Sequence, residues 1–187
     1  RTAGGQELLA RVCLITPDDR VILACPQSEM GQGVHDGLPK IVAEELDADW
    51  SRVEVRLPWA DDAFVNPITK RHRTANSEST MVYYDLLRKA GATAREMLVA
   101  AAAAAWSVPA TECTTPGDSR VVHTASGRSA RYGELAAAAA SLPPPATPRL
   151  KDPASFRLIG RATPRKDTPS KVDGSAVYGI DVKQPGM

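Results

Sequence analysis

Cysteine is scarce in this chain of 187 residues, which holds three: Cys13, Cys25 and Cys113. No two of them form a Cys-x-x-Cys pair, so the chain cannot build a four-ligand zinc or iron–sulfur site from them. Cys13 and Cys25 fall on neighbouring predicted strands, where a disulfide is geometrically allowed. We expect buried free thiols instead. No residues are predicted to ligate a metal ion directly.

A charge excess of one sign is also missing. The chain has 23 Lys and Arg against 22 Asp and Glu, a net charge of +1. Nucleic-acid surfaces usually need a concentrated basic excess, so a nucleic-acid partner is not expected. The densest positive run, residues 70–73, fits either a solvated loop or a site for a phosphate or carboxylate.

Long apolar runs are absent as well. The longest, residues 97–111, is mostly alanine, and it is shorter than the ~20 residues that a membrane span needs. We therefore predict no membrane span and assign this run to the helix of a soluble domain.

The distribution of apolar residues predicts regular elements along most of the chain. Period-2 alternation indicates strands, and apolar residues three or four positions apart indicate helices. The expected elements are a β-hairpin (8–15 and 21–25), a helix (36–47), a strand (53–57), a long helix (80–106), a strand (121–123) and a short helix (132–141).

This order predicts an α+β fold in which a small, mostly antiparallel sheet is covered by helices on one face, as a two-layer sandwich. We assign residues 1–142 to this domain. Three consecutive prolines then end regular structure, so residues 143–170 are predicted to be a proline-rich linker lying along a surface. Alternating apolar residues in 171–187 predict the first strand of an incomplete second domain.

The stretch from Ser28 to Gly33, Ser-Glu-Met-Gly-Gln-Gly, carries the strongest chemical signal. Glycine lets a backbone turn sharply and approach a ligand closely, and backbone N–H groups can then bind an anion. Glutamine adds a donor and an acceptor. The alternative is a plain loop before a helix, in which Gly31 and Gly33 only provide backbone angles that other residues rarely adopt and bind no ligand.

Seven stretches along the chain together suggest a family. They are Glu-Met-Gly-Gln-Gly (29–33), Val-Ala-Glu-Glu-Leu (42–46), Trp-Ser-Arg-Val-Glu-Val (50–55), Leu-Arg-Lys-Ala-Gly-Ala (87–92), Tyr-Gly-Glu-Leu (132–135), Phe-Arg-Leu-Ile-Gly (156–160) and Asp-Thr-Pro-Ser-Lys-Val-Asp-Gly (167–174). In this order they resemble the xanthine dehydrogenase and aldehyde oxidase family, and most closely the large subunits of isoquinoline 1-oxidoreductase-type enzymes and membrane-linked aldehyde dehydrogenases. The last stretch resembles the entry to that family's hammerhead-like domain.

The resemblance implies a site. It makes Gly31, Gln32 and Gly33 contacts of a molybdopterin cofactor that carries molybdenum, with the cytosine dinucleotide form as one option. It also makes Glu29 a candidate for orienting the substrate. For Glu29 the alternative is a carboxylate that only accepts hydrogen bonds from nearby backbone N–H groups.

A second loop departs from the family pattern. Relatives carry Thr-Gly-Gly-Ser-Thr-Ser before the long helix, whereas residues 74–79 here are Thr-Ala-Asn-Ser-Glu-Ser. Thr74, Ser77 and Ser79 keep their hydroxyls and are predicted cofactor contacts. Glu78 adds a negative charge, which either is screened by Arg71 or Arg73 or alters cofactor binding.

The resemblance further implies the N-terminal segment of the large subunit of a molybdenum hydroxylase, which oxidises an aldehyde or an N-heterocycle with water as the oxygen source. In such families the catalytic glutamate lies near the far C-terminus of a longer chain, so the segment alone is expected to be inactive. The expected partners are the rest of the large subunit, a small iron–sulfur subunit, a small-molecule substrate and, in some relatives, a cytochrome c subunit.

One alternative stays open, a non-catalytic binding or assembly module that has lost pterin binding. The resemblance favours the periplasm, and the cytoplasm stays an option. His35 is expected to face solvent at a helix start, with contact to a phosphate or a substrate as the alternative. Trp50, Trp59 and Trp106 are expected to pack as core anchors.

Overall fold

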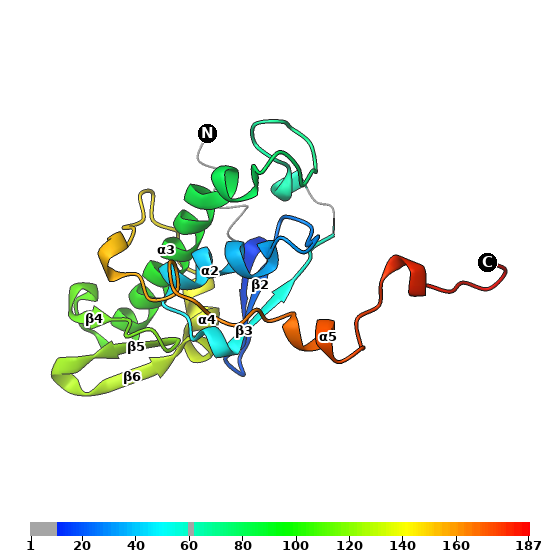
Figure 1. Cartoon of the computed structure of the whole chain (residues 1–187). Coiled ribbons are helices and arrows are strands. Elements are labelled where there is room, and N and C mark those ends of the chain that lie inside the picture. Colours follow the sequence, from blue (N-terminus) through cyan, green and yellow to red (C-terminus); the bar gives the residue numbers. More distant parts are fainter. Residues whose placement is uncertain (1–10, 60–61) are drawn as a thin grey trace.

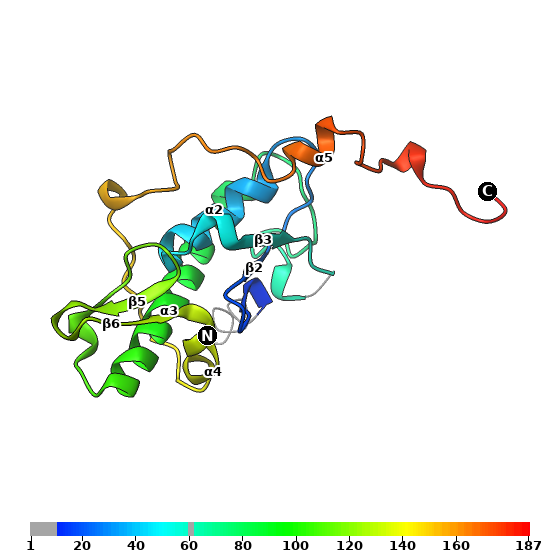
Figure 2. The ribbon, with the colours of Figure 1, turned by 90° about the horizontal axis from the view of Figure 1, so that it is seen from below.

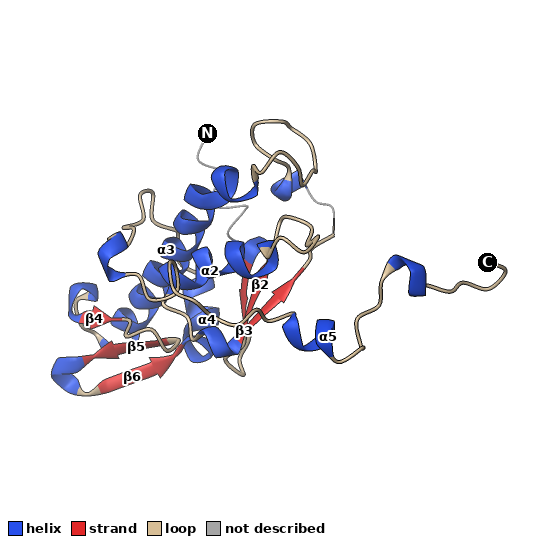
Figure 3. Cartoon of the chain, viewed as in Figure 1, coloured by secondary structure: helices blue, strands red, loops and turns tan. Residues whose placement is uncertain are grey.

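The computed structural model of the chain describes residues 11–59 and 62–187 (Figure 1). Most predicted elements have a helix or strand close to their expected position, and Figure 3 shows helices and strands mixed through the molecule, so the predicted α+β class is confirmed. The helices are α2 (Val34–Leu46), α3 (Ser79–Trp106), α4 (Tyr132–Ala140) and α5 (Thr168–Val172). The strands are β1 (Cys13–Ile15), β2 (Val21–Ala24), β3 (Val53–Arg56), β4 (Cys113–Thr114), β5 (Arg120–His123) and β6 (Arg128–Arg131).

Within the described residues the strands form two sheets of three strands each, where one mostly antiparallel sheet was expected. In the first sheet β2 pairs antiparallel with β1 and parallel with β3. The helix α2 provides the crossover that a parallel neighbour requires. In the second sheet β5 lies between β4 and β6, and both pairs are antiparallel. Figures 1 and 2 show the second sheet near the C-terminal end of α3, apart from the first.

The predicted hairpin is confirmed for the described residues, whereas its first positions, 8–10, lie outside them. Thr16 N donates to Arg20 O at 3.0 Å and closes the turn. Asp19 takes a left-handed backbone with φ 64°, which aspartate tolerates better than most residues. Its Oδ1 accepts a hydrogen bond from Gly133 N at 2.7 Å. The turn therefore fixes the start of α4 against the first sheet.

The two main helices, α2 and α3, pack at very short range. A Cβ placed on Gly91 would lie 2.4 Å from the carbonyl oxygen of Val42 and 2.8 Å from Glu45 Cβ. A side chain cannot occupy that space without moving the α2 backbone. Alanines in the second half of α3 are buried too, among them Ala101 and Ala102. The missing side chain of Gly91 thus permits the short distance between these helices.

Two buried tyrosines donate hydrogen bonds to backbone carbonyls of other elements. Tyr83 donates its hydroxyl to Phe64 O at 2.9 Å, and Tyr132 donates to Leu46 O at 2.7 Å. Burial raises the pKa of both hydroxyls, so both stay protonated donors. Of the tryptophans expected in the core, Trp50 and Trp106 pack against it, but Trp59 is 94% exposed. That expectation was wrong because Trp59 follows β3 into a surface loop.

Residues 149–167, here called the strap, cross the outer side of α2 and α3. The carboxylate of Glu44, 0% exposed, accepts hydrogen bonds through Oε2 from the backbone N–H groups of Arg157, Leu158 and Ile159 at 2.8, 2.6 and 3.1 Å. Its Oε1 accepts from Lys151 Nζ at 2.7 Å. The buried carboxylate of Glu44 therefore anchors the strap to α2.

Glu45, next in α2, is also 0% exposed and receives both arginines of α3 that face it. Arg88 Nε donates to Glu45 Oε1 at 2.7 Å, and Arg95 Nη1 donates to Glu45 O at 2.6 Å. Arg88 and Arg95 each use a second nitrogen to bond strap carbonyls, those of Lys151 and Arg149. These buried ions are all paired, as burial of charge requires.

The end of the chain differs from its prediction. Residues 171–187 form no strand in the structure; they hold the end of α5 and the short 3-10 helix Gly179–Asp181. A strand needs a neighbouring strand for its hydrogen bonds, and this segment runs away from both sheets in Figures 1 and 2. The predicted boundaries at 142 and 170, and the hammerhead-like domain, stay predictions.

The three cysteines are free thiols, as expected. Burial raises the pKa of Cys13 and of Cys25 to about 12, so both stay protonated at neutral pH. No helix within the described ranges is long and apolar enough to cross a membrane.

Candidate functional site

The loop from Ser28 to Gly33, here called the first loop, joins β2 to α2. Gly31 and Gly33 have φ of 98° and 83°, which side-chain-bearing residues rarely adopt. Gly33 is also the residue that caps α2, with no side chain of its own to bond the free N–H groups. A carboxylate elsewhere in the loop has to supply that cap.

Glu29 supplies it. Its Oε1 accepts hydrogen bonds from Gly31 N at 2.8 Å and from Gly33 N at 2.9 Å, and its Oε2 accepts from His35 N at 3.0 Å. Negative charge at a helix N-terminus is further stabilised by the helix dipole. The side chain is 11% exposed. This geometry is that of the capping alternative, while the substrate-orienting role of Glu29 stays a prediction.

The pKa of Glu29 reflects these contacts. Desolvation by burial raises it, but the hydrogen bonds from His35, Gly33 and Gly31 and the positive charge of Arg165 together outweigh burial. The pKa of Glu29 therefore lies below its ordinary value, and the carboxylate is ionised at neutral pH. It acts as an acceptor and a charge, not as a proton donor.

The Gln32 side chain braces the same loop. Its Oε1 accepts from Met30 N at 2.6 Å and its Nε2 donates to Ser28 O at 2.8 Å. Gln32 and Gly31 are nevertheless exposed, and a Cβ placed on Gly31 would meet no atom within 4 Å. Hydrogen bonds within the first loop thus fix its shape, while its outer face is exposed at Gly31 and Gln32.

Residues 74–79, here called the second loop, lie beside the first, and the two together are called the double loop. Thr74 Oγ1 accepts from Ser28 N at 3.0 Å, and Ser79 Oγ donates to Gln27 Oε1 at 2.9 Å. The structure therefore brings together two stretches that are 46 residues apart in the chain. Ser77 is exposed and makes neither contact. All of the predicted site residues thus lie in the double loop.

The second loop replaces glycine without losing its bend. Asn76 and Ser77 both have φ of 55°, in the left-handed region that asparagine visits more readily than most residues. Asn76 Nδ2 donates to Glu78 Oε1 at 3.3 Å. Among the described residues no ion pair joins Glu78 to Arg71 or Arg73, and Glu78 Oε2 is buried without a hydrogen-bond partner. Within the described part of the chain, the two arginines that the sequence offered therefore form no ion pair with Glu78.

Two hollows flank Met30. One, of ≈ 390 Å³, lies between the two loops and is lined by Ser28 and Thr74 with Arg73, Trp59 and others. The other, of ≈ 700 Å³, is lined by Glu29 and Gly31 together with Arg165 and Asp167 of the strap. Residues 72 and 73 of the basic run thus face the site, and both interpretations of that run stay open.

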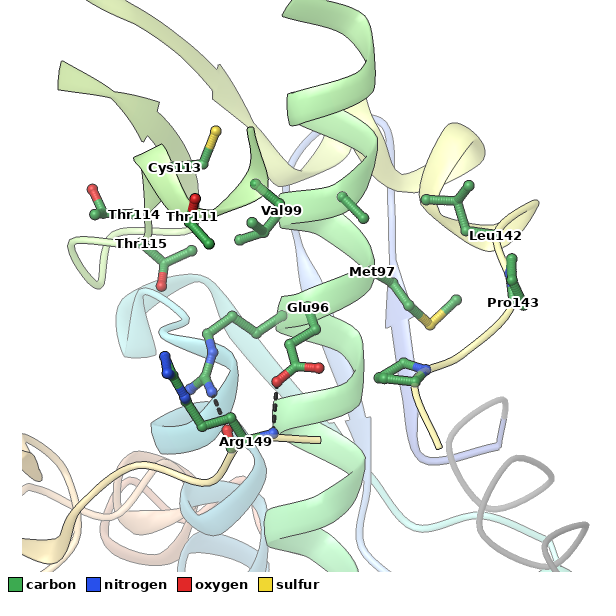
Figure 4. Close-up of a pocket in the computed structure, with 14 residues that line it drawn as sticks. Glu96, Met97, Val99, Thr111, Cys113, Thr114, Thr115, Leu142, Pro143 and Arg149 are labelled. Atoms are coloured by element: carbon green, nitrogen blue, oxygen red, sulfur yellow. Dashed lines mark hydrogen bonds between the residues drawn. The ribbon is translucent and has the colours of Figure 1, made fainter. Parts of the chain in front are cut away.

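A third hollow, of ≈ 540 Å³, lies between α3, β4 and the start of the strap (Figure 4). Its wall carries the apolar side chains of Met97, Val99 and Leu142 beside the threonines around β4, and Arg149 N donates to Glu96 Oε1 at 2.6 Å. None of the predicted site residues lines it. It is separate from the double loop.

The double loop suits a polar cofactor in some respects. Its outer face is exposed at Gly31, Gln32 and Ser77, and His35 Nε2 is buried without a partner at the end of the first loop. An unpaired buried nitrogen is costly unless a ligand or water meets it. By contrast, the N–H groups of Gly31 and Gly33 are already bonded to Glu29. Within the described residues no cluster of three or more His, Cys, Asp or Glu could hold a metal.

Comparison with known proteins settles the family. The family model of the molybdopterin cofactor-binding domain matches residues 4–183. The chain belongs to this family. The resemblance to molybdopterin-binding large subunits of the xanthine dehydrogenase family is thereby confirmed, since the relatives of this domain include such subunits.

Three relatives illustrate the range of the family. The beta subunit of isoquinoline 1-oxidoreductase from Brevundimonas diminuta is 42% identical, over 91% of this chain and 26% of its own. A membrane-bound aldehyde dehydrogenase (pyrroloquinoline-quinone) from Gluconacetobacter polyoxogenes is 31% identical, over 94% and 22%. A nicotinate dehydrogenase subunit from Pseudomonas putida is 30% identical, over 96% and 15%. The chain spans about a quarter, or less, of the length of these relatives.

A solved structure shares the fold. Quinoline 2-oxidoreductase from Pseudomonas putida 86 superposes with a TM-score of 0.51 at 19% identity, over 72% of this chain and 17% of its own. At that identity the likeness concerns the fold alone.

Sequence reasoning missed one residue of this site, Arg165, and misjudged the surroundings of another, His35. Arg165 reaches the first loop from the strap: its Nη2 lies 3.2 Å from Glu29 Oε1, and its Nη1 donates to Gly31 O at 3.1 Å. His35 was expected in solvent, but its Nε2 is buried. The only sequence signal for Arg165 is Asp167 two positions on, a weak one within a predicted linker.

Proposed function

We propose that this chain is the cofactor-contacting N-terminal segment of the large subunit of a molybdenum hydroxylase, which oxidises an aldehyde or an N-heterocycle with water as the oxygen source. The observation that carries the proposal is the double loop, whose exposed outer face lies within the stretch matched by the molybdopterin-binding family. The names of two relatives, an isoquinoline oxidoreductase and an aldehyde dehydrogenase, support the two substrate classes.

Within this proposal the residues have distinct tasks. When bound, the cofactor supplies the redox chemistry at its metal. The cofactor would contact the first loop at Gly31, Gln32 and Gly33, where small residues allow its close approach. The second loop would add hydroxyl groups, those of Thr74, Ser77 and Ser79. Glu29, at the edge of the larger hollow, is placed to orient a substrate or to keep the first loop in shape. The cytosine dinucleotide form of the cofactor is part of the proposal.

The partners are also part of the proposal. They are the rest of the large subunit, a small iron–sulfur subunit and, by analogy with some relatives, a cytochrome c. The isolated segment is expected to be inactive. The name of the second relative specifies pyrroloquinoline quinone, a different cofactor, but the domain match favours molybdopterin.

The competing proposal is a binding or assembly module that has lost pterin binding. It is favoured by one observation, that both glycine N–H groups of the first loop are already bonded to Glu29. A cofactor that needs those donors would have to displace a carboxylate.

A glycine substitution separates the two proposals. In the full-length subunit co-expressed with its small partner, Gly33→Val puts a branched side chain at φ 83°, beside Arg165 Nη1 at 3.7 Å. Gly127→Val is the matched control, because it has φ 70° and nothing within 4 Å of its Cβ, in the turn before β6. Both variants carry backbone strain of ~1–2 kcal/mol.

We expect Gly33→Val to lose most of its molybdenum and pterin, measured by mass spectrometry of the metal and fluorescence of the oxidised pterin, while Gly127→Val keeps both. Equal cofactor content in the two variants would count against the first proposal and in favour of the second.

A further inference from the structure

Arg165 of the strap contacts two residues of the first loop and lies beside a third. Its Nη2 lies 3.2 Å from Glu29 Oε1, its Nη1 donates to Gly31 O at 3.1 Å, and a Cβ on Gly33 would lie 3.7 Å from the same Nη1. Arg165 and Gly31 are 134 positions apart. Such a contact ties the loop to a distant part of the chain.

The guanidinium of Arg165 also forms a pair of hydrogen bonds with the carboxylate of Asp167. Arg165 Nε donates to Asp167 Oδ1 at 2.9 Å, and Nη2 donates to Asp167 Oδ2 at 2.7 Å. This is the two-pronged pairing that fixes the plane of a guanidinium. With its plane fixed, the group directs its remaining N–H groups toward the first loop.

The residues on both sides of Arg165 are docked onto α2 as well. Lys166 N donates to Asp36 Oδ1 at 3.1 Å, and Lys166 Nζ donates to Trp50 O at 2.8 Å and lies 4.5 Å from the Trp50 ring centroid. Lys40 Nζ of α2 donates to Thr163 Oγ1. The backbone around Arg165 is therefore positioned independently of the first loop.

Charge explains why an arginine is needed there. Glu29 is ionised and only 11% exposed, and its other partners are neutral N–H groups. Among its described partners, Arg165 brings the positive charge. A buried carboxylate without a compensating charge is costly and tends to take up a proton or move into solvent.

We propose that Arg165, oriented by Asp167, is a positioning residue that sets the conformation of Glu29 and of the first loop, so that the strap controls the shape of the cofactor-contacting surface. This inference rests on the proposed function, because the surface that Arg165 shapes is the one proposed to contact the cofactor. Arg165 does not touch the reacting atoms; it acts through Glu29 and the carbonyl of Gly31.

The test uses the full-length subunit with its small partner, prepared both with cofactor and without. Amide hydrogen exchange is followed in a peptide covering residues 28–35, which contains the three N–H groups bonded to Glu29. A peptide from the middle of α3 reports on the rest of the fold. Arg165→Ala removes the contact, Arg165→Lys keeps the charge without the fork, and Asp167→Asn weakens its orientation. Arg161→Ala, exposed in the same strap, is the matched control.

In the cofactor-free preparation we expect exchange in residues 28–35 to rise about tenfold or more in Arg165→Ala, less in Arg165→Lys and Asp167→Asn, and not at all in Arg161→Ala. The α3 peptide should stay unchanged. Unchanged exchange in residues 28–35 of Arg165→Ala would overturn the proposal, and so would an equal rise in α3, because that result marks a general loss of stability.

In the cofactor-loaded preparation the same variants should lose molybdenum and pterin in the same order. If the loop responds in the cofactor-free protein but the variants keep their cofactor, Arg165 still positions the loop, and the inferred control of cofactor contact by the strap fails. If the loop responds and the unaltered protein takes up no cofactor, the positioning role stands and the proposed function fails. The two proposals thus have separate outcomes.

Discussion

Glu29 links nearly every part of the candidate site, since it bonds two glycines of the first loop, the second residue of α2 and the strap. The sequence could nominate it, because a carboxylate next to Gly-x-Gly before a helix is a natural cap. It could not show that both oxygens are engaged. Those hydrogen bonds depend on the exact bend of the loop, which two positive φ angles create.

Substitution of Glu29 separates its two proposed tasks. In Glu29→Gln one carboxylate oxygen becomes an NH2 group that faces a backbone N–H donor, and the charge that pairs with Arg165 is lost. Because charge-assisted hydrogen bonds contribute ~1.5–3 kcal/mol each, we expect the loop to loosen and molybdenum content to fall severalfold. A variant that keeps its metal but turns over slowly would instead assign Glu29 to the substrate.

Protonation should have the same effect as that substitution. The pKa of Glu29 is lowered in the folded protein, so its stabilising contribution is complete above the ordinary carboxyl pKa of ~4.3 and is lost as pH falls through the lower, folded value. Pterin release after incubation from pH 7 down to pH 3 should therefore begin only below about pH 4.3. Release that starts near pH 6 would point to another group.

Arg165 shows where residue-level prediction stops. Nothing in its neighbourhood in the sequence indicates that it meets Gly31, because the contact depends on how the strap crosses α2. The hydroxyls of Thr74 and Ser79 were predicted, but from family resemblance. Their partners, Ser28 N and Gln27, emerged only from the fold.

At the scale of elements, helices and strands were predicted well because each has its own period. The α2, α3 and α4 helices begin within two residues of their predicted starts at 36, 80 and 132. Pairing was predicted poorly, since alternation does not say which strand is the neighbour or in which direction it runs. Hence β3 was placed correctly, while its parallel pairing with β2 and the second sheet were not foreseen.

The closeness of α2 and α3 gives a prediction at this scale. Gly91→Ala should lower the free energy of unfolding by ~1–3 kcal/mol, because its Cβ would overlap Val42 O. Gly37→Ala in α2 is the control: nothing lies within 4 Å of its Cβ, so the higher helix propensity of alanine should raise stability by up to ~1 kcal/mol. Denaturant midpoints of both variants check this. A neutral or stabilising Gly91→Ala would contradict the packing described.

At the scale of the whole molecule, the strap turned out to be more firmly attached than a linker. The segment was predicted to lie along a surface, and its anchor consists of buried charges that proline content alone does not reveal. Glu44 contributes most to this attachment, because its carboxylate accepts hydrogen bonds from three strap N–H groups and from Lys151. Desolvation raises the pKa of Glu44, but Lys151 and the N–H groups outweigh it and lower that pKa.

Removal of this anchor should release the strap. Glu44→Ala leaves Lys151, 12% exposed, with less compensation and is expected to cost ~3–5 kcal/mol. Limited proteolysis of Glu44→Ala should then cut within residues 149–167 faster than in the unaltered chain. In the unaltered chain the first cuts are expected at the more exposed positions of the segment after Ala146. Glu54→Ala, in an exposed ion-pair cluster, should leave the pattern unchanged. Early cleavage in the alanine-rich half of α3 would contradict the fold.

The central claim is that this chain forms part of a molybdopterin enzyme, and the most direct measurement is the cofactor content of the intact protein. The full-length subunit, co-expressed with its small iron–sulfur partner in a host that makes the cofactor, should carry molybdenum and pterin in a one-to-one ratio to the subunit. A folded, stable complex that holds neither, under conditions that load a related enzyme, would contradict the account.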